Sequence, residues 1–401
     1  MPRGLSLARG AAGLPPAAWV LFAGTFVNRF GGFVLVFLVL YLRQRGYSAA
    51  EAGLALSAYG AGSLAASAAG GHLADRIGRR NAIALSMFAS AAATLALSQA
   101  PSLALVVILS GLVGLASELY RPASAALVAD LTPAGGRVTA FALYRLAINA
   151  GFAAGPVVGG LLAERSFFLV FLGDAITSAL FGAVALFALP QGVRSRPHEE
   201  ETGALRAILA DRTFCSFLAA SLAGALVYLQ ATATLPLQVV AHGHAKTVYG
   251  ALMSLNGLAI VALELPLSLA TRRLPPRPVM AAGSVLVGAG FGLTALAGSV
   301  PALAATVAVW TLGEMVFSPV ASAYVADLAP AALRGRYSGA WGLTWGVALV
   351  AGPPLGTLLY SWRHAAVWVA CLALGCVAAA LILAEREPRV RPQAPLELDA
   401  R

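Results

Sequence analysis

GHLADRIGRR spans residues 71–80 and separates two long apolar runs, 49–70 and 82–100. Each run approaches the roughly 20 residues that a helix needs to cross a lipid bilayer. A connection this short makes the two crossing segments antiparallel neighbours. Besides Asp75, the stretch carries three arginines. Because basic loops stay on the cytoplasmic side of a membrane, residues 71–80 are predicted to face the cytoplasm.

The composition of the chain excludes a water-soluble globular protein. Of its 401 residues, 59% are hydrophobic and 11% are charged, and the mean hydropathy is +0.80. So few charges cannot cover a water-exposed surface, which indicates an integral membrane protein. The net charge of +10 does not indicate a nucleic-acid partner, because most arginines fall in short loops between apolar runs. The sequence contains no Walker loop, and its three cysteines lie in apolar runs. We therefore predict no enzymatic activity, no cofactor and no metal site.

The apolar runs predict twelve membrane-spanning helices. They lie near residues 17–42, 49–71, 82–100, 102–126, 138–163, 167–189, 213–240, 248–271, 279–299, 302–326, 336–360 and 364–384. The longest polar interruption, 190–212, is predicted to be a cytoplasmic linker between a first half, 1–189, and a second half, 213–384. The charged residues 385–401 are predicted to form a cytoplasmic tail.

The basic residues are distributed unevenly between the two sides of the membrane. With both termini inside, inner segments hold 19 of the 27 basic residues, outer loops hold five, and three lie within spans. This asymmetry predicts cytoplasmic termini and an even number of spans. One lysine stands against 26 arginines, and alanine and glycine are abundant. That bias is typical of a GC-rich bacterial genome, so we expect the bacterial cytoplasmic membrane as the location.

The two halves repeat each other. A shift of 197 residues places Pro122 on Pro319, Asp130 on Asp327 and the Gly155-Pro156 pair on Gly352-Pro353. Over residues 122–162 this ungapped shift gives 16 identities in 41 positions. Aligned Asp and Gly-Pro residues are not explained by alanine richness. The expected fold class is therefore all-α, with two pseudo-symmetric six-helix halves.

The stretch at 71–80 resembles the signature loop of the major facilitator superfamily, which follows the pattern Gly-x-Leu-x-Asp-Arg-x-Gly-Arg-Arg between spans 2 and 3. The resemblance covers nearly the whole chain and implies two halves that rock about a central substrate path. It also implies that Asp75 lies near the start of span 11, and that Arg79 can pair with Asp130. The expected gating residues are Gly71, Asp75, Arg76, Gly78, Arg79, Arg80 and Asp130.

Span 5 carries a second motif, Gly-x-x-x-Gly-Pro-x-x-Gly-Gly. Its residues are Gly151, Gly155, Pro156, Gly159 and Gly160. Small residues let this helix approach a neighbour closely, and a proline can bend it. The motif resembles that of proton-coupled exporters in the superfamily, and the general layout is similar to bacterial multidrug:proton antiporters. The resemblance implies export; composition and spacing do not.

Charged residues within the predicted spans mark candidate coupling sites. A charge at mid-membrane costs about 2.5–3.5 kcal/mol on insertion scales, so it must be paired, face water or change its protonation. Glu118 and Arg121 are three residues apart and can meet on span 4. Glu264 and Glu314 have no basic residue within the spans of their own half, although Glu264 can also meet cytoplasmic arginines. Asp174 is expected to support a helix contact. The proton-coupling candidates are, in order, Glu314, Glu118, and then Glu264 and Asp174.

In this fold, spans 1, 4, 7 and 10 line the central cavity. The candidate cavity residues, each with core packing as the alternative, are Asn28, Arg29, Arg121, Arg145, Asn149, Gln230, Asn256, Trp341 and Trp345. We expect a monomer that exports small, partly hydrophobic compounds in exchange for protons. A second interpretation is a proton-coupled importer of a sugar, peptide or organic anion, which the surplus positive charge of the first half would suit. A third is a membrane scaffold or sensor without transport, in which the buried charges would be dispensable.

Overall fold

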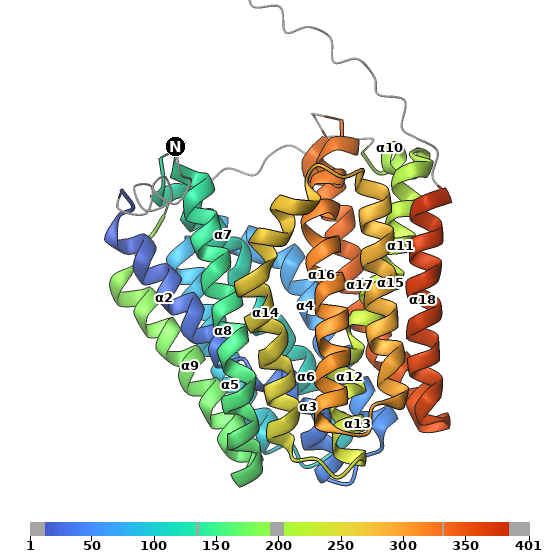
Figure 1. The fold of residues 1–401 in the computed structure, drawn as a ribbon. Coiled ribbons are helices and arrows are strands. Elements are labelled where there is room, and N and C mark those ends of the chain that lie inside the picture. The colour runs from blue at the N-terminus through green and yellow to red at the C-terminus, as the bar shows by residue number, and fades with distance from the viewer. Residues whose placement is uncertain (1–12, 134–135, 193–203, 331–332, 385–401) are drawn as a thin grey trace, which may run out of the picture.

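The described part of the chain is a bundle of long helices. A computed structural model describes residues 13–133, 136–192, 204–330 and 333–384, and every regular element in these ranges is helical (Figure 1). Eleven helical segments in these ranges are long and apolar enough to cross a membrane. The 29-residue helix α4 (Ala49–Ile77) equals them in length and packs between two of them. Together they correspond to the twelve predicted spans.

The first half contains six predicted spans in eight helices. They are α2 (Pro16–Phe30), α3 (Phe33–Gln44), α4, α5 (Arg79–Ser98), α6 (Leu103–Glu118), α7 (Tyr120–Leu131), α8 (Arg137–Arg165) and α9 (Phe167–Ala188). Span 1, predicted as one helix, is interrupted between α2 and α3 at Gly31 and Gly32. A Cβ at Gly31 would overlap the side chain of Thr177 on α9. The absence of a Cβ at Gly31 therefore permits the close approach of this segment to α9.

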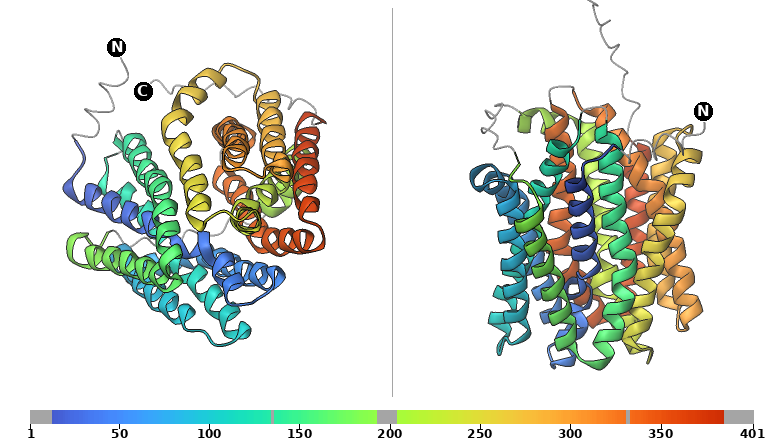
Figure 2. Two further views of the ribbon diagram at one scale, coloured as in Figure 1. Left: turned by 60° about the horizontal axis from the view of Figure 1, so that its bottom comes forward. Right: turned by 90° about the vertical axis from the view of Figure 1, so that its left-hand side faces the viewer.

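The second half repeats this arrangement. Its helices are α10 (Ala204–Ala210), α11 (Arg212–Tyr228), α12 (Gln230–Ala233), α13 (Leu235–Ala241), α14 (Lys246–Thr271), α15 (Pro276–Leu293), the 3₁₀ turn η2 (Thr294–Leu296), α16 (Val300–Leu328), α17 (Arg334–Trp362) and α18 (His364–Ala384). Span 7 is divided into α11, α12 and α13, so the first span of each half is broken. Figure 2 shows the two halves as separate groups of helices.

The stretch at 71–80 is more helical than we predicted. Helix α4 continues through it to Ile77, and α5 begins at Arg79. Gly78 alone separates the two helices, with a φ of 89°. A positive φ strains residues that carry a Cβ but not glycine. A single glycine therefore makes the turn, and the prediction of a ten-residue loop was wrong in this respect.

Hydrophobic packing differs between the two ends of the bundle. We call the end that carries α10, the start of α2 and the last residue of α18 the terminal end, and the other the opposite end (Figure 1). At the opposite end one apolar cluster joins both halves, and Phe37 of α3 packs edge-on against Tyr249 of α14 at 5.5 Å. At the terminal end each half has an apolar cluster of its own. The halves are therefore joined at the opposite end and packed independently at the terminal end.

Two helix pairs carry the contact between the halves, α8 with α14 and α4 with α17. Close backbone approach marks both pairs. A Cβ at Gly250 of α14 would overlap the carbonyl oxygen of Pro156, and the Ser57 hydroxyl of α4 donates to the carbonyl of Val350 at 2.6 Å. The α4–α17 contact ends before the terminal end, because a Cβ at Gly335, Gly339 or Gly342 would meet no described atom within 4 Å.

Candidate functional site

A charged cluster lies in the first half, where α2 meets the junction of α6 and α7. Arg29 donates to Glu118 at 3.2 Å, and Arg121 donates to the other oxygen of the same carboxylate at 2.8 Å. The Arg29 guanidinium also lies over the Tyr120 ring, 5.6 Å from its centre. The expected meeting of Glu118 and Arg121 is confirmed. Two guanidiniums share one carboxylate, so the cluster carries a net positive charge.

The cluster is only partly enclosed. The side chain of Glu118 is 9% exposed, whereas that of Arg121 is 59% exposed. The Nε and Nη2 atoms of Arg29 are buried and have no hydrogen-bond partner among the described residues. A buried charged donor without a partner is costly, so these two nitrogens are available to an anionic group.

The second half holds a half-buried carboxylate of different character. Glu314 of α16 accepts a hydrogen bond from the Asn256 amide of α14 at 3.0 Å, and the same amide nitrogen donates to the Thr311 hydroxyl at 3.1 Å. Asn256 is completely buried, and its Oδ1 has no hydrogen-bond partner in the described part of the chain. The site therefore presents acceptor oxygens, in contrast to the donors of the first half.

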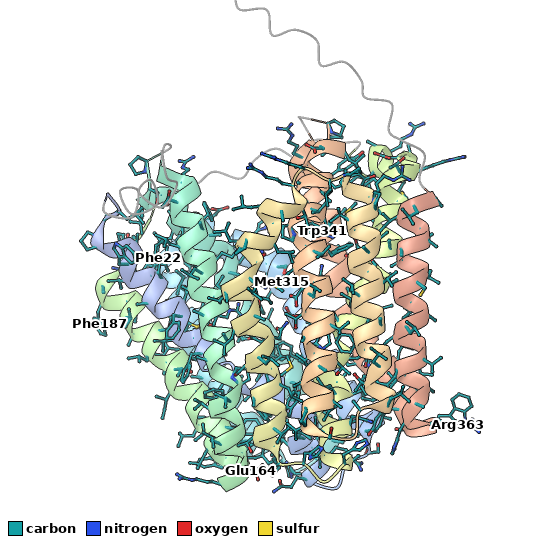
Figure 3. The ribbon with its side chains drawn as sticks, viewed as in Figure 1. Phe22, Glu164, Phe187, Met315, Trp341 and Arg363 are labelled. Atoms are coloured by element: carbon teal, nitrogen blue, oxygen red, sulfur yellow. The ribbon has the colours of Figure 1, made fainter. Side chains whose placement is uncertain are left out.

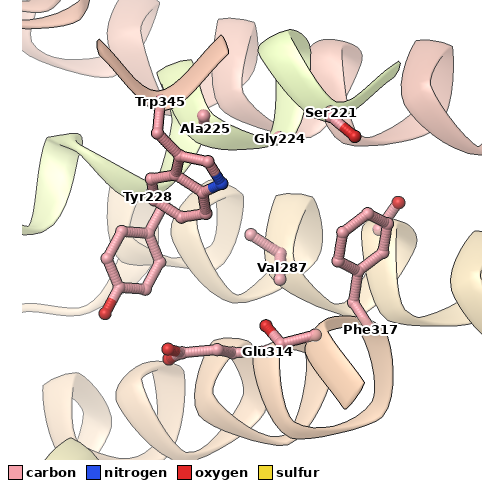
Figure 4. Close-up of a pocket in the computed structure, with 10 residues that line it drawn as sticks. Ser221, Gly224, Ala225, Tyr228, Val287, Glu314, Phe317 and Trp345 are labelled. Atoms are coloured by element: carbon pink, nitrogen blue, oxygen red, sulfur yellow. The ribbon is translucent and has the colours of Figure 1, made fainter. Parts of the chain in front are cut away.

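Glu314 also lines a small pocket bounded by α11, α15, α16 and α17 (Figure 4). Tyr228, Phe317 and Trp345 supply aromatic walls, and the Tyr228 hydroxyl points toward the side on which the Glu314 carboxylate lies. The pocket encloses about 40 Å³, close to the volume of one water molecule. Only a terminal group of a substrate would fit there, so its body would extend between the halves.

Arg145 and Glu264 form an ion pair between the two halves. The Arg145 guanidinium of α8 donates to the Glu264 carboxylate of α14 at 3.0 Å. We expected Glu264 to lack a basic partner within its own half, and its partner indeed comes from the other half. The pair therefore bridges the two halves of the bundle.

Several expected cavity residues serve packing instead. Asn28 is buried and donates to Met87 and Ser178 within the first half. Gln230 donates to the carbonyls of Leu226 and Gly352. Both side chains satisfy polar groups between helices, as their alternative interpretation proposed.

The remaining candidate residues lie in different surroundings. Asp174 accepts from the backbone N–H of Val34 at 3.0 Å, which supports the expected helix contact. Trp345 lines the small pocket, and Trp341 packs against Phe217. Asn149 is partly buried on α8.

The signature residues at 71–80 hold the first half together. Arg79 forms an ion pair with Asp130 of α7, as expected, and donates to the carbonyl of Ala126 at 2.9 Å. No hydrogen bond or ion pair joins Asp75 to α17 among the described residues. A Cβ at Gly335, in the first turn of α17, would meet no described atom within 4 Å. The expected contact of Asp75 with the start of span 11 is therefore not made in this conformation.

The glycine motif of span 5 has two faces. Gly151 and Gly155 lie against the backbone of α2, where a Cβ at Gly151 would stand 2.7 Å from the carbonyl oxygen of Phe26. Gly160 and Pro156 face α14 of the other half, and a Cβ at Gly160 would stand 2.8 Å from the Cα of Thr247. Gly159 lies against Phe33 and Phe37 of α3. The motif therefore lets α8 pack closely against its own half and across the boundary.

These features coincide with a match to a known family. The family model of the Major Facilitator Superfamily matches residues 21–245 and again residues 222–400, one match for each half. The chain belongs to this superfamily. Proteins of the superfamily are membrane transporters and not enzymes, so this chain is a multi-pass membrane transporter.

Similar major facilitator proteins include three bacterial transporters. The uncharacterized transporter YqjV of Bacillus subtilis (strain 168) is 28% identical over 351 residues, which are 85% of each chain. The Na(+), Li(+), K(+)/H(+) antiporter of Planococcus maritimus is 26% identical over 363 residues, 82% of this chain and 85% of the relative. The multidrug resistance protein MdtH of Aeromonas hydrophila is 29% identical over 362 residues, 88% and 90% of the two chains.

Solved structures show the same major facilitator fold. A crystal structure of the peptide transporter POT in complex with sulfate has a TM-score of 0.76 at 21% identity and covers 92% of this chain and 94% of that one. The nucleoside transporter NupG has a TM-score of 0.76 at 16% identity, with 92% and 98% covered. At this identity the likeness concerns the fold alone.

Part of this site was not predicted from the sequence of this major facilitator protein. Tyr228 and Phe317, which line the pocket, and Thr311, which accepts from the same Asn256 amide as Glu314, were not among the candidates. Thr311 and Phe317 each stand three residues from Glu314, so helical spacing places them beside it on α16. Tyr228 lies on span 7, which lines the cavity in this fold. Both signals were available before the structure.

Proposed function

We propose that this chain exports small, partly hydrophobic compounds in exchange for protons across the bacterial cytoplasmic membrane. The observation that carries the proposal is the half-buried Glu314, which accepts a hydrogen bond from neutral Asn256 at the edge of an aromatic pocket. A carboxylate with neutral neighbours can hold a proton, and aromatic walls suit an apolar substrate with a polar or cationic terminus. Relatives named as a multidrug resistance protein and as a cation/proton antiporter support the same class.

Protonation and conformation are coupled in this proposal. Glu314 takes up a proton while the site faces one side of the membrane and releases it while the site faces the other, so its protonation state biases the conformation of the halves. Rocking of the two halves alternates which side of the membrane supplies the proton. The basic cluster of Arg29 and Arg121 would favour release of that proton whenever the halves bring it toward Glu314.

We also propose the orientation of the chain. The excess of arginine on one side places both termini, and so the terminal end of the bundle, in the cytoplasm. The joined opposite end then faces outward, and the conformation described is closed to the outside. In the alternate conformation Asp75 would approach the start of α17, where a carboxylate is favoured by the helix dipole.

The matched experiment compares Glu314→Gln with Glu51→Gln in proteoliposomes. Glutamine keeps the size of the protonated side chain, so Glu314→Gln should still exchange substrate across the membrane. It should lose accumulation driven by a pH gradient, by roughly ten-fold or more, because proton coupling is gone. Glu51 is an exposed helix cap, and its variant should behave as the wild type. Unimpaired pH-driven transport by Glu314→Gln would rule out the assignment.

A second function has one specific observation in its favour. The two unpartnered guanidinium nitrogens of Arg29 could hold the carboxylate of an organic anion or peptide, which suits proton-coupled uptake. A substrate-panel assay in inside-out vesicles, with and without a collapsed proton gradient, separates the two functions. It measures the direction of transport and the charge of the transported compound.

A further inference from the structure

A second hollow lies at the opposite end of the bundle, away from Glu314. It encloses about 460 Å³ and is lined by residues of both halves. The first half contributes the end of α3 and the start of α4, including Leu40 and Arg43. The second half contributes α13 and the corner between α17 and α18, including Leu237, Tyr360 and His364. No function proposed above uses this hollow.

The wall of the hollow contains a buried donor without a partner. Tyr360 is 6% exposed, and its hydroxyl has no hydrogen-bond partner among the described residues. Its ring stacks on the His364 imidazole, with centres 4.4 Å apart, so the side chain is held in place. A buried hydroxyl without a hydrogen-bond partner destabilises the folded protein. A hydroxyl fixed at the edge of a hollow is a donor available to a ligand.

The side chains that line the hollow favour a negatively charged ligand. One guanidinium nitrogen of Arg43 donates a hydrogen bond to the carbonyl oxygen of Tyr47 at 2.8 Å. A guanidinium has five N–H donors, so others remain for the hollow. His364 adds a second group that can donate. None of the ten residues that line the hollow is acidic.

We propose that this hollow binds a small anionic group, a phosphate or a carboxylate, through Arg43 and the Tyr360 hydroxyl, with Leu40 and Leu237 against any apolar part. The group could belong to a free anion or to the headgroup of an anionic lipid. Because the walls come from both halves, the complete site exists only while the opposite end is joined. A ligand there therefore stabilises this conformation over the alternate one. The hollow is in this proposal a regulatory site at the opposite end of the bundle from the terminal end, and Glu314 does not line it.

The first test measures binding of inorganic phosphate to the purified protein by its midpoint of thermal unfolding, against chloride at equal ionic strength. Phosphate should raise the midpoint of the wild type. Arg43→Gln should weaken phosphate binding roughly ten-fold or more, because a charge-assisted hydrogen bond is lost. Arg363→Gln removes a charge at the same end of the bundle (Figure 3) from a residue that does not line the hollow, and it should bind as the wild type.

Tyr360→Phe separates ligand binding from folding. It removes only the unpartnered hydroxyl, so the midpoint without phosphate should stay equal or rise. Phosphate affinity should fall by roughly two- to ten-fold, the loss expected for one hydrogen bond. An equal phosphate effect in wild type, Arg43→Gln and Tyr360→Phe would overturn the site for free phosphate.

The second test identifies the source of the anion and its effect on conformation. Spin labels at Gln99 and Leu296, exposed at the opposite end of the two halves, report their separation in nanodiscs. Phosphate, or phosphatidylglycerol in place of neutral lipid, should increase the population with the shorter distance. A response to the lipid but not to phosphate assigns the site to a headgroup. If neither changes the distances, or if Arg43→Gln responds equally, the proposal fails.

Discussion

At the scale of single residues, charged side chains pair both within one helix and between helices that are distant in the sequence. The pair of Glu118 and Arg121 follows from their spacing on one helix, and the structure confirms it. The pairs of Arg29 with Glu118 and of Arg145 with Glu264 join residues 89 and 119 positions apart. No local spacing encodes such pairs, because they depend on how helices cross. The sequence therefore shows which charged side chains lie within the spans but not which residues from other helices pair with them.

Glu118→Gln tests the charged cluster of the first half. The substitution leaves the guanidiniums of Arg29 and Arg121 facing a neutral amide, and removal of one partner from a buried ion pair costs roughly 3 kcal/mol. We expect a clearly lower midpoint of thermal unfolding in detergent. The exposed Glu51→Gln should change the midpoint much less. An unchanged midpoint for Glu118→Gln would show that the cluster contributes nothing to stability.

At the scale of helices, the sequence predicted the spans well and their interruptions poorly. Apolar length fixes where a helix crosses the membrane, so helices such as α9 and α18 lie almost where expected. The breaks at Gly31–Gly32 and at Leu229 serve contacts between helices and leave apolar length unchanged. Hydrophobicity alone could not show them. Hydrophobicity also did not show that α4 continues to Ile77, because its last turns contain charged residues.

Gly250→Ala tests the crossing of α8 and α14. Its methyl group would overlap the carbonyl oxygen of Pro156, so the two helices must separate where the halves are joined. We expect the spin-label distances between Gln99 and Leu296 to shift toward the longer population. Gly111→Ala is the matched control, because its methyl group would stand 3.4 Å from the nearest atom, within one half. Identical distances in the two variants would contradict a tight crossing.

At the scale of the whole molecule, the repeat in the sequence predicted two similar halves, and the fold confirms them. The sequence could not predict which end of the bundle would be joined, because the same residues must serve both conformations of a rocking transporter. The single apolar cluster at the opposite end, against two separate clusters at the terminal end, is a property of this conformation. The sequence does not distinguish this conformation from the one in which the terminal end is joined.

The orientation of the molecule in the membrane gives a prediction at this scale. Single cysteines replace Arg45, His244 or Arg363 in a background without Cys215, Cys371 and Cys376. Each should react with an impermeant thiol reagent added outside intact cells, because basic residues are concentrated on the other side. A cysteine in place of Arg196 should react only after the cells are opened. The reverse pattern would invert the proposed topology.

The joined end of the bundle contains the one lysine of the sequence. Lys246 begins α14, where its ammonium donates to Gln44 at 3.0 Å and to the carbonyl of Ala163 at 3.2 Å, both in the other half. Glu164, which also lies at this end (Figure 3), accepts from the backbone N–H groups of Lys246 and Thr247.

An amine engaged in this way reacts slowly with acylating reagents, and separation of the halves would release it. The reactivity of the Lys246 amine therefore depends on whether the two halves are in contact at this end. The rate at which an impermeant acylating reagent modifies Lys246 would measure how often the opposite end opens, without any engineered label.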